Sequence, residues 1–376
     1  MHAIGPILFP FTGTSTGGSH ISTFTLADAL RTSHGVPVQV SAPAGSSIAA
    51  EANRRALPLI EEPVAPKRRR LAFTDVTHLA RRRASLAAMG PGAVVHVSDL
   101  WTMASWGLAA KSIGLPIVYH NRAFTNGDWM DRKLLRLANA IVCISDACRT
   151  RLRGAEGMDV TNIVNPFNLP DATVGRDEAR AEWVERWPIT GVRLVGTSGN
   201  FTPRKRPDFF IEAAAIVAAA DASARFILFG HDRDGSAARL HARAGELGIA
   251  DRVAFAGFRS PPERNLAGLD VLAVPALAEP FGRTLVEALM LDVPYVATDD
   301  AGHGEIARAW GGGLLVPRDS DAPAFAAAIV RALVTPPRLN AAERAQLFND
   351  VEPATHAARV LEIYRRLFHD PAKRAA

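Results

Sequence analysis

The sequence predicts an α/β protein made of two Rossmann-like domains, each a parallel sheet covered by helices on both faces. The first observation is the length of 376 residues, which divides most naturally into two domains. The second is a regular alternation of short β-rich runs with longer Ala-, Leu- and Arg-rich segments, which is typical of parallel sheets. The third is that polar, glycine-containing loops follow several of the runs, where such sheets bind ligands.

The predicted strands fall into two sets. The first set comprises an N-terminal strand within residues 1–11 and the runs 36–42, 93–97, 116–120 and 140–145. The second set comprises the runs 193–197, 225–229, 252–256, 271–275 and 294–298. Helices are expected between them, as at 208–220, 237–247 and 285–291.

The prolines Pro166, Pro170 and Pro188 indicate a boundary between the two sets. We therefore expect a first domain over residues 1–168 and a second over 169–352. A last helical stretch near 354–368 follows the second domain, and residues 353–376 are expected to cross back onto the first.

Composition excludes several classes of protein. Apolar residues make up 48% of the chain and mean hydropathy is +0.05, which is typical of a globular protein. The two cysteines are too few for a disulfide framework or a zinc site of several thiolates. No apolar run approaches the ~18 residues of a membrane span, and the N-terminus lacks a basic flank. We expect a cytoplasmic protein.

Positive charge is concentrated in the first half of the chain. Residues 1–170 hold 18 Lys and Arg against 11 Asp and Glu, whereas the remainder holds 25 against 27. An excess of this kind favours an anionic partner. No basic stripe is interleaved with aromatic residues, so nucleic acid is not an expected partner.

Two glutamates, Glu279 and Glu287, surround the start of the helix predicted after the 271–275 strand. Free N–H groups and the dipole at a helix start suit a diphosphate. A carboxylate accepts hydrogen bonds from hydroxyls, so Glu287 is expected to bind a ribose and Glu279 a hexose. Each glutamate taken singly is equally compatible with a solvated surface charge. The intervening residues expected to contact the same ligand are Phe281, Gly282, Arg283 and Thr284.

A second polar loop follows the 193–197 strand and carries Asn200, Arg204, Lys205 and Arg206. Departure of a nucleoside diphosphate develops negative charge, which fixed cations stabilise in the transition state. A plain basic surface turn is the alternative.

Two weaker signals lie in the first half. Gly17 and Gly18 follow the first strand and permit close approach of the backbone to a ligand, although a tight turn explains them equally well. His96 and His120 stand at strand ends, where a histidine is often structural.

With these motifs in this order, nearly the whole chain resembles retaining glycosyltransferases of the GT-B fold, family 4. The resemblance is weakest around residues 45–90. It implies two parallel sheets that face a central cleft. Glu279 and Glu287 match the family's E-x7-E motif, and Lys205 matches its phosphate-binding lysine.

In the first domain, Gly17 and Gly18 match the loop that closes on the donor, and His120 matches a histidine near the reacting sugar. The chain departs from the family at Asn200, where an arginine is usual. Arg204 or Arg206 is expected to supply the missing charge. The usual glycine pair of the 299–305 loop is replaced by Gly302-His303-Gly304.

The resemblance implies transfer of a hexose, with retention, from a UDP- or GDP-sugar to a hydroxyl of a glycan or lipid-linked acceptor. Synthesis of a bacterial envelope polysaccharide or lipopolysaccharide is the expected setting. Glu279, His120 and Lys205 are the expected catalytic residues, and backbone near Phe258 and Arg259 is expected to read the base. The nucleotide sugar is a co-substrate, and no other cofactor is expected. Since no Asp-x-Asp motif follows a suitable strand, no metal is expected.

Two alternatives remain at this point. A sugar-nucleotide epimerase of the same architecture would share the diphosphate site, but the spacing of Glu279 and Glu287 favours transfer. A catalytically silent nucleotide-binding partner is disfavoured because both Lys205 and Glu279 are present.

A basic stretch comprises Lys67-Arg68-Arg69-Arg70 and Arg81-Arg82-Arg83, with Asp75 the only acid between the two runs. If residues 70–83 are helical, Arg70 and Arg81 share a face. The stretch then predicts peripheral contact with an anionic membrane or with a phosphate-bearing acceptor. The alternative is a solvated charged helix.

Overall fold

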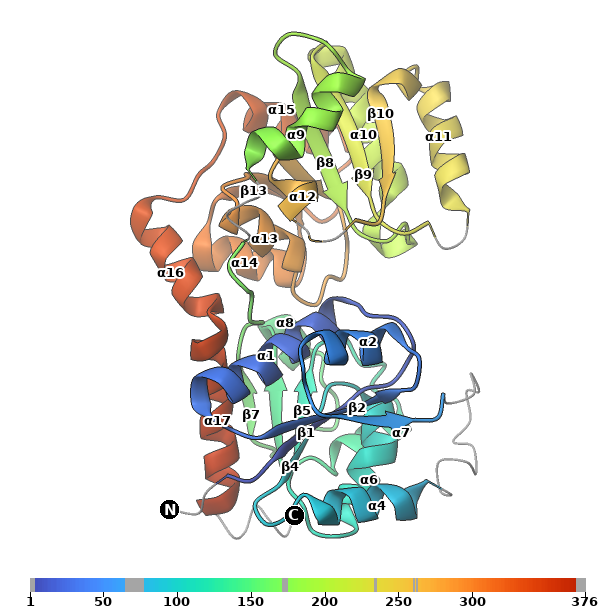
Figure 1. Ribbon diagram of the computed structural model, residues 1–376. Coiled ribbons are helices and arrows are strands. Elements are labelled where there is room, and N and C mark those ends of the chain that lie inside the picture. Colours follow the sequence, from blue (N-terminus) through green and yellow to red (C-terminus); the bar gives the residue numbers. More distant parts are fainter. Residues whose placement is uncertain are drawn as a thin grey trace. The chain divides into compact units, whose positions relative to one another are not determined.

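The computed structural model describes residues 4–64, 78–170, 175–232, 235–259, 261 and 263–369. The chain forms two compact units (Figure 1). Unit 1 comprises Met1–Asn168 together with Asp350–Ala376, and unit 2 comprises Leu169–Asn349. Each unit is built on one parallel sheet, which confirms the predicted α/β fold class.

Unit 1 holds a seven-stranded sheet in the order β3-β2-β1-β4-β5-β6-β7. Its strands are β1 (Ile7–Pro10), β2 (Val38–Pro43), β3 (Leu59–Glu62), β4 (Val94–Val97), β5 (Ile117–Asn121), β6 (Ala140–Cys143) and β7 (Val160–Asn162). Its helices are α1 (Gly18–His34), α2 (Ser47–Arg54), α4 (Leu79–Ala88), α5 (Leu100–Thr102), α6 (Leu108–Lys111), α7 (Trp129–Leu135), α8 (Asp146–Thr150) and α17 (Pro353–His369). A π-helical turn, Met103–Gly107, separates α5 from α6.

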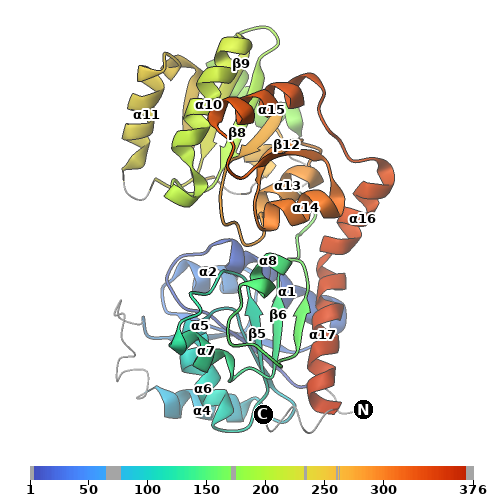
Figure 2. The same cartoon turned by 180° about the vertical axis from the view of Figure 1, so that it is seen from behind.

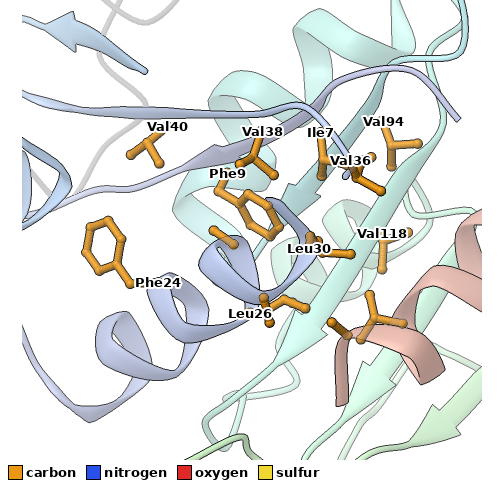
Figure 3. Packing of buried hydrophobic residues seen from close by; sticks show 14 of the residues in the cluster. Ile7, Phe9, Phe24, Leu26, Leu30, Val36, Val38, Val40, Val94 and Val118 are labelled. Carbon is orange, nitrogen blue, oxygen red and sulfur yellow. The ribbon is translucent and has the colours of Figure 1, made fainter. Parts of the chain in front are cut away.

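Helices α1, α2 and α17 close one face of this sheet. Phe24, Leu26 and Leu30 of α1 pack on strand residues such as Phe9 and Val38, and all five side chains are buried (Figure 3). Helix α17 lies against α1 and contributes Tyr364 and other apolar residues to the same core (Figures 1 and 2). The C-terminal segment is therefore part of the core of unit 1.

Unit 2 holds a six-stranded sheet in the order β10-β9-β8-β11-β12-β13. Its strands are β8 (Arg193–Ser198), β9 (Ala224–Phe229), β10 (Val253–Gly257), β11 (Val271–Val274), β12 (Tyr295–Asp299) and β13 (Gly313–Pro317). Its helices are α9 (Arg176–Arg186), α10 (Pro207–Ala220), α11 (Ser236–Glu246), α12 (Glu263–Leu266), α13 (Arg283–Met290), α14 (Gly302–Trp310), α15 (Ala322–Val334) and most of α16 (Ala341–Val351). Residues of α10, α11 and α15 form one core with the strands.

Every strand predicted from the sequence is present within a few residues of its expected bounds, and so are the helices expected at 208–220, 237–247, 285–291 and 354–368. Three strands were missed: β3, β7 and β13, each at an edge of its sheet. Their residues are only partly buried for the most part, so they lack the continuous apolar run that identifies a central strand.

The strand orders define where ligands are expected to bind. In each sheet, successive strands are first added on one side of the first strand and then on its other side. The strand order therefore reverses between β1 and β4 in unit 1 and between β8 and β11 in unit 2. The carboxyl ends of the two strands at such a reversal leave a crevice that parallel sheets use for ligands. A ligand site is therefore expected at the loops after β1, β4, β8 and β11.

Over the residues that the structure describes, no helix combines the length and the apolar character that a membrane span requires.

Candidate active site

In unit 2 the loops after β8 and β11 meet at the reversal of the strand order. The backbone N–H of Leu277 donates to the carbonyl oxygen of Arg204 at 2.9 Å, which joins the two loops directly. Arg204 and Lys205 lie in a short 3-10 turn after β8, and Arg206 then adopts a left-handed conformation at the start of α10. This local geometry directs the two cations of the turn toward the second loop.

Glu279 accepts hydrogen bonds from both cations. Lys205 Nζ lies 2.7 Å from Glu279 Oε2, and Arg204 Nη1 lies 2.5 Å from the same oxygen. The Glu279 side chain is only 13% exposed. The structure thus brings together two predicted catalytic residues, Glu279 and Lys205, which are 74 positions apart in the chain.

The charge state of Glu279 follows from this setting. Burial opposes ionisation of the carboxyl group, but the ammonium of Lys205 and the guanidinium of Arg204 outweigh burial and hold the pKa of Glu279 below its ordinary value. Glu279 is therefore a carboxylate near neutral pH. It can accept hydroxyl hydrogen bonds through any lone pair that the two cations leave free.

Helix α13 begins beside this carboxylate. Gly282 caps it with φ of 105°, in the left-handed region that favours glycine, and a Cβ atom there would lie 2.7 Å from the ring of His303. Arg283 Nη2 donates to Glu287 Oε1 at 3.1 Å one turn along the helix. Phe281 is buried and Thr284 is partly exposed.

His303 lies at the same place and was not proposed from the sequence as a site residue. Its ring is fully buried against Gly282. Burial lowers the pKa of His303 to about 4, so the ring is neutral near pH 7. The charge of Glu279 raises the pKa of the ring and the charge of Lys205 lowers it. The sequence feature that could have identified His303 is its position in a glycine-rich loop that follows a predicted strand.

The structure distinguishes between the two arginines expected to compensate for Asn200. Arg204 contacts Glu279. Arg206 instead stacks over the Phe209 ring, with its guanidinium carbon 3.8 Å from the ring centroid. Arg204 is therefore the better candidate for the charge that the family places at position 200.

Phe258 and Arg259, the expected base-reading residues, follow β10. The Phe258 ring is 62% exposed and stacks on His231, with 4.3 Å between centroids and 8° between planes. The Arg259 side chain is engaged elsewhere, in two hydrogen bonds of 2.6 Å to Glu182 and over the Trp183 ring. An exposed flat surface is thus available at Phe258, whereas Arg259 offers only its backbone.

In unit 1 the loop after β1 leads into α1. Gly17 is extended and precedes the helix, and its N–H donates to His20 Nδ1 at 3.1 Å. Gly17 and Gly18 are both exposed. The loop is held to the end of β4 by a hydrogen bond from Thr12 Oγ1 to Asp99 Oδ2 at 3.3 Å.

His120, which was expected near the reacting sugar, has its contacts inside unit 1. The His120 ring is fully buried inside unit 1. Its Nδ1 lies 3.1 Å from His96 Nε2 and 3.2 Å from Arg122 Nη2, and its ring stacks on His356 of α17. The histidine at the strand end therefore belongs to an internal polar network, and no face of its ring is open to a ligand in this structure.

The partners of this network determine where its protons lie. A guanidinium can only donate, so His120 Nδ1 accepts from Arg122. Without a proton of its own, Nδ1 can only share its single lone pair between Arg122 and His96, which places a proton on His96 Nε2. Burial, with Arg122 nearby, lowers the pKa of both histidines well below the ordinary value, so each ring carries one proton. His96 Nδ1 therefore accepts from the Tyr364 hydroxyl, 2.6 Å away.

We predict that Tyr364→Phe destabilises the protein by about 1–3 kcal/mol, because it leaves the buried Nδ1 of His96 without a donor. Tyr119→Phe is the matched control, since its hydroxyl makes only a 3.3 Å bond to Asn121. Urea unfolding of the two variants measures the difference. Equal stabilities would contradict a stabilising role for the hydrogen bond between Tyr364 and His96.

The structure also corrects the prediction for the basic stretch. Residues 67–70 lie outside the described residues, and α4 begins only at Leu79. Arg82 is buried and donates to Glu62 through Nη2 at 2.6 Å and Nε at 3.0 Å, so it is not a surface cation. Arg81 and Arg83 are exposed.

Two family models match the chain. The description "Glycosyl transferases group 1" applies to residues 179–347, and "Glycosyltransferase Family 4" applies to residues 16–168. The two matches fall in unit 2 and unit 1 respectively.

Sequence relatives are consistent with these models. The chain is 29% identical to the lipopolysaccharide core biosynthesis glycosyltransferase LpsE of Rhizobium meliloti over 204 residues, which is 54% of this chain and 56% of the relative. It is 28% identical to the alpha-D-kanosaminyltransferase of Streptomyces kanamyceticus over 218 residues, 55% of this chain and 54% of the relative. The chain thus spans about half the length of the relatives it matches.

Solved structures show the same fold. A glycosyltransferase from Rickettsia africae superposes with a TM-score of 0.83 at 17% identity, covering 98% of this chain and 100% of that one. Alr3699/HepE of Anabaena, solved with UDP and glucose, superposes with a TM-score of 0.79 at 19% identity, covering 96% and 100%.

Proposed function

The chain belongs to the group 1 (family 4) glycosyltransferases, and from this premise we propose that it transfers a hexose from a UDP- or GDP-sugar to a hydroxyl group with retention of configuration. The observation that carries the proposal is the contact of Lys205 and Arg204 with Glu279 at the reversal of the strand order in unit 2. A sugar diphosphate needs cations for its phosphates and a carboxylate for its hydroxyls. Both kinds of group are in contact there. The Anabaena neighbour of the same fold was solved with UDP and glucose.

In the proposed complex, Lys205 and the start of α13 bind the diphosphate. Arg204 contributes the second cation, and Glu287 accepts hydrogen bonds from the ribose. Glu279 binds sugar hydroxyls. Because its ring is buried, His120 is left out of the ligand contacts.

The reaction breaks the bond between the anomeric carbon and the oxygen of the outer phosphate. The acceptor oxygen forms the new bond on the same face, and its proton passes to the departing phosphate oxygen, so that a nucleoside diphosphate leaves. The cations stabilise the charge that develops on that phosphate. No covalent enzyme intermediate is required.

The acceptor is proposed to be a glycan or a lipid-linked sugar, in line with the lipopolysaccharide function of the LpsE relative. A peripheral position on the inner face of the membrane is part of the same proposal, with Arg81 and Arg83 as exposed cations of unit 1. Co-sedimentation with anionic vesicles, weakened by salt, tests it. Reversal of both Arg81 and Arg83 to Glu should abolish this binding, and Arg82 is left unchanged because it is buried.

We expect one nucleotide sugar to stabilise the protein in a thermal-shift series of UDP-, GDP-, ADP- and dTDP-sugars. A ligand at 100 times its Kd raises the free energy of unfolding by about 2.7 kcal/mol. Glycosyl transfer to a glycoside acceptor, measured with the same donor, then separates transfer from mere binding. Isomerisation of the sugar without an acceptor would identify an epimerase instead, and absence of any shift would contradict a donor site.

Activity is expected to survive chelation with EDTA after dialysis. Among the residues that the structure describes, no cluster of three His, Cys, Asp or Glu side chains is placed to hold a metal ion, and the diphosphate charge falls to Lys205 and Arg204. Turnover with and without EDTA is the measurement. Complete loss that magnesium or manganese restores would show that the reaction needs a metal.

A further inference from the structure

Two large tryptophans are exposed near the carboxyl edge of the sheet in unit 1. Trp101 is 60% exposed and lies in α5, four residues after the end of β4. Trp129 is 64% exposed and begins α7, in the connection after β5. Helix α5 packs beside α7 (Figure 2), so the two tryptophans come from neighbouring elements. Exposed aromatic residues that gather in one region mark an interaction site more often than a bare surface.

A carboxylate stands next to the first tryptophan, at the reversal of the strand order. Asp99 Oδ1 accepts from the N–H of Thr102 at 2.7 Å, and Asp99 Oδ2 accepts from Thr12 Oγ1 at 3.3 Å. The backbone N–H of Trp101 is a third donor to Asp99. A carboxylate offers about four lone-pair positions, so Asp99 retains the capacity to accept one further hydrogen bond from a ligand hydroxyl. The loop that bears Gly17 is tied to the same carboxylate through Thr12.

The backbone after Asp99 is unusual in a way that favours a site. The π-helical turn Met103–Gly107 interrupts the helix directly behind Trp101, and such turns occur frequently at functional sites. It buries Trp106 while Trp101 stays exposed. A Cβ atom on Gly107 would lie 2.6 Å from the Met103 sulfur, so the methionine side chain packs closely on this glycine.

The charges around the second tryptophan are balanced. Asp128 precedes Trp129 in sequence, and Asp131, Arg132 and Lys133 follow it. Lys133 Nζ lies 4.9 Å from the centroid of the Trp129 ring. An anionic membrane attracts surfaces with a net excess of cations, which this group does not have. A ligand with many hydroxyls, by contrast, needs both donors and acceptors around an apolar surface.

We propose that Trp101 and Trp129, together with Asp99, form a subsite that binds a carbohydrate ring of the acceptor. The C–H bonds of a pyranose ring carry slight positive charge and are attracted to the negative face of an indole. Hydroxyls at the ring edge then donate to Asp99 and accept from Lys133. The assignment rests on the proposed transferase function and gives its acceptor a chemical class and a location in unit 1.

The test measures transfer of NMR saturation from the protein to methyl α-glucopyranoside, methyl α-galactopyranoside and methyl α-mannopyranoside. Each tryptophan is replaced in turn by Phe, Leu and Ala. We expect the Leu and Ala variants to lose saturation by about five- to tenfold, as loss of one aromatic contact implies, while the Phe variants retain most of it. Asp99→Asn should weaken the binding as well.

Leu108→Ala is the matched control, since Leu108 is an exposed apolar residue of the nearby helix α6, and it should bind the glycosides as the wild type does. Binding of UDP and GDP, followed by thermal shift, should be the same in every tryptophan variant as in the wild type. If the wild type binds neither nucleotide, that result would count against the transferase function itself rather than against the subsite.

Three outcomes would overturn the subsite. The first is that the Leu variants bind the glycosides as well as the Phe variants do. The second is that the wild type transfers saturation to none of the three glycosides. The third is that the Ala variants no longer sediment with phosphatidylglycerol vesicles but keep full saturation of the sugars. The last outcome would identify a lipid-docking surface.

Discussion

Glu279→Gln is expected to lower the rate of glycosyl transfer by about 10²–10³-fold, and Lys205→Met by a similar factor, as removal of one transition-state contact typically does. Both side chains are held in place before any ligand binds, by the 2.7 Å contact between them. Gln keeps the shape of Glu279 but removes the charge that pairs with Lys205. Met keeps much of the length of Lys205 but cannot stabilise the departing phosphate.

The double variant should be scarcely slower than either single variant, because the two residues contact each other and act as one unit. Arg239→Ala is the matched control. Arg239 forms an exposed ion pair with Asp208 on the helices α10 and α11 of the same unit, and its loss should leave turnover unchanged. Turnover and melting temperature need to be measured on the same samples. Turnover within about threefold of wild type, in a folded single variant, would contradict the assignment.

The fold was predictable where burial imposes a pattern on the sequence. Central strands such as β9 and β11 are buried through most of their length and have largely apolar sequences. The edge strand β7 has three partly exposed residues, which no periodicity can distinguish from a loop. The strand order, which explains why the loops after β8 and β11 meet, depends on pairing between distant segments and leaves no local signal.

The candidate site was predictable in its residues and less so in its contacts. Lys205 and Glu279 were identified by their motifs, but their direct ion pair is a product of the fold. His120 was expected near the sugar because it matches a histidine of the family, yet α17 covers it with His356. A residue contributed from the far end of the chain cannot be foreseen from the sequence around the strand.

Arg82 illustrates a further limit, because three consecutive arginines look alike in the sequence. Successive residues of a helix point about 100° apart, so the register of α4 decides which of the three faces inward. The structure selects Arg82, which meets Glu62 at 2.6 Å and lies over the Trp106 ring. Its neighbours Arg81 and Arg83 remain exposed.

We therefore expect Arg82→Ala to destabilise the protein by about 3–5 kcal/mol, because it leaves Glu62 as a buried charge without its partner. Glu62→Ala should cost a similar amount for the converse reason. Both side chains are about nine-tenths buried, so solvent does little to screen the pair. Urea unfolding of the wild type and the two variants gives the free energies of unfolding. The comparison holds when the midpoint urea concentration falls and the m-value stays the same.

The matched control is Arg81→Ala, which removes the same side chain from the adjacent, exposed position and should change stability by less than about 0.5 kcal/mol. The double variant Glu62→Leu with Arg82→Leu removes both charges and should recover part of the loss, since an apolar pair of similar volume leaves no buried charge behind. If Arg82→Ala were no more destabilising than Arg81→Ala, Arg82 would be a solvated surface cation, as the sequence first indicated, and it would return to the residues available for an anionic membrane.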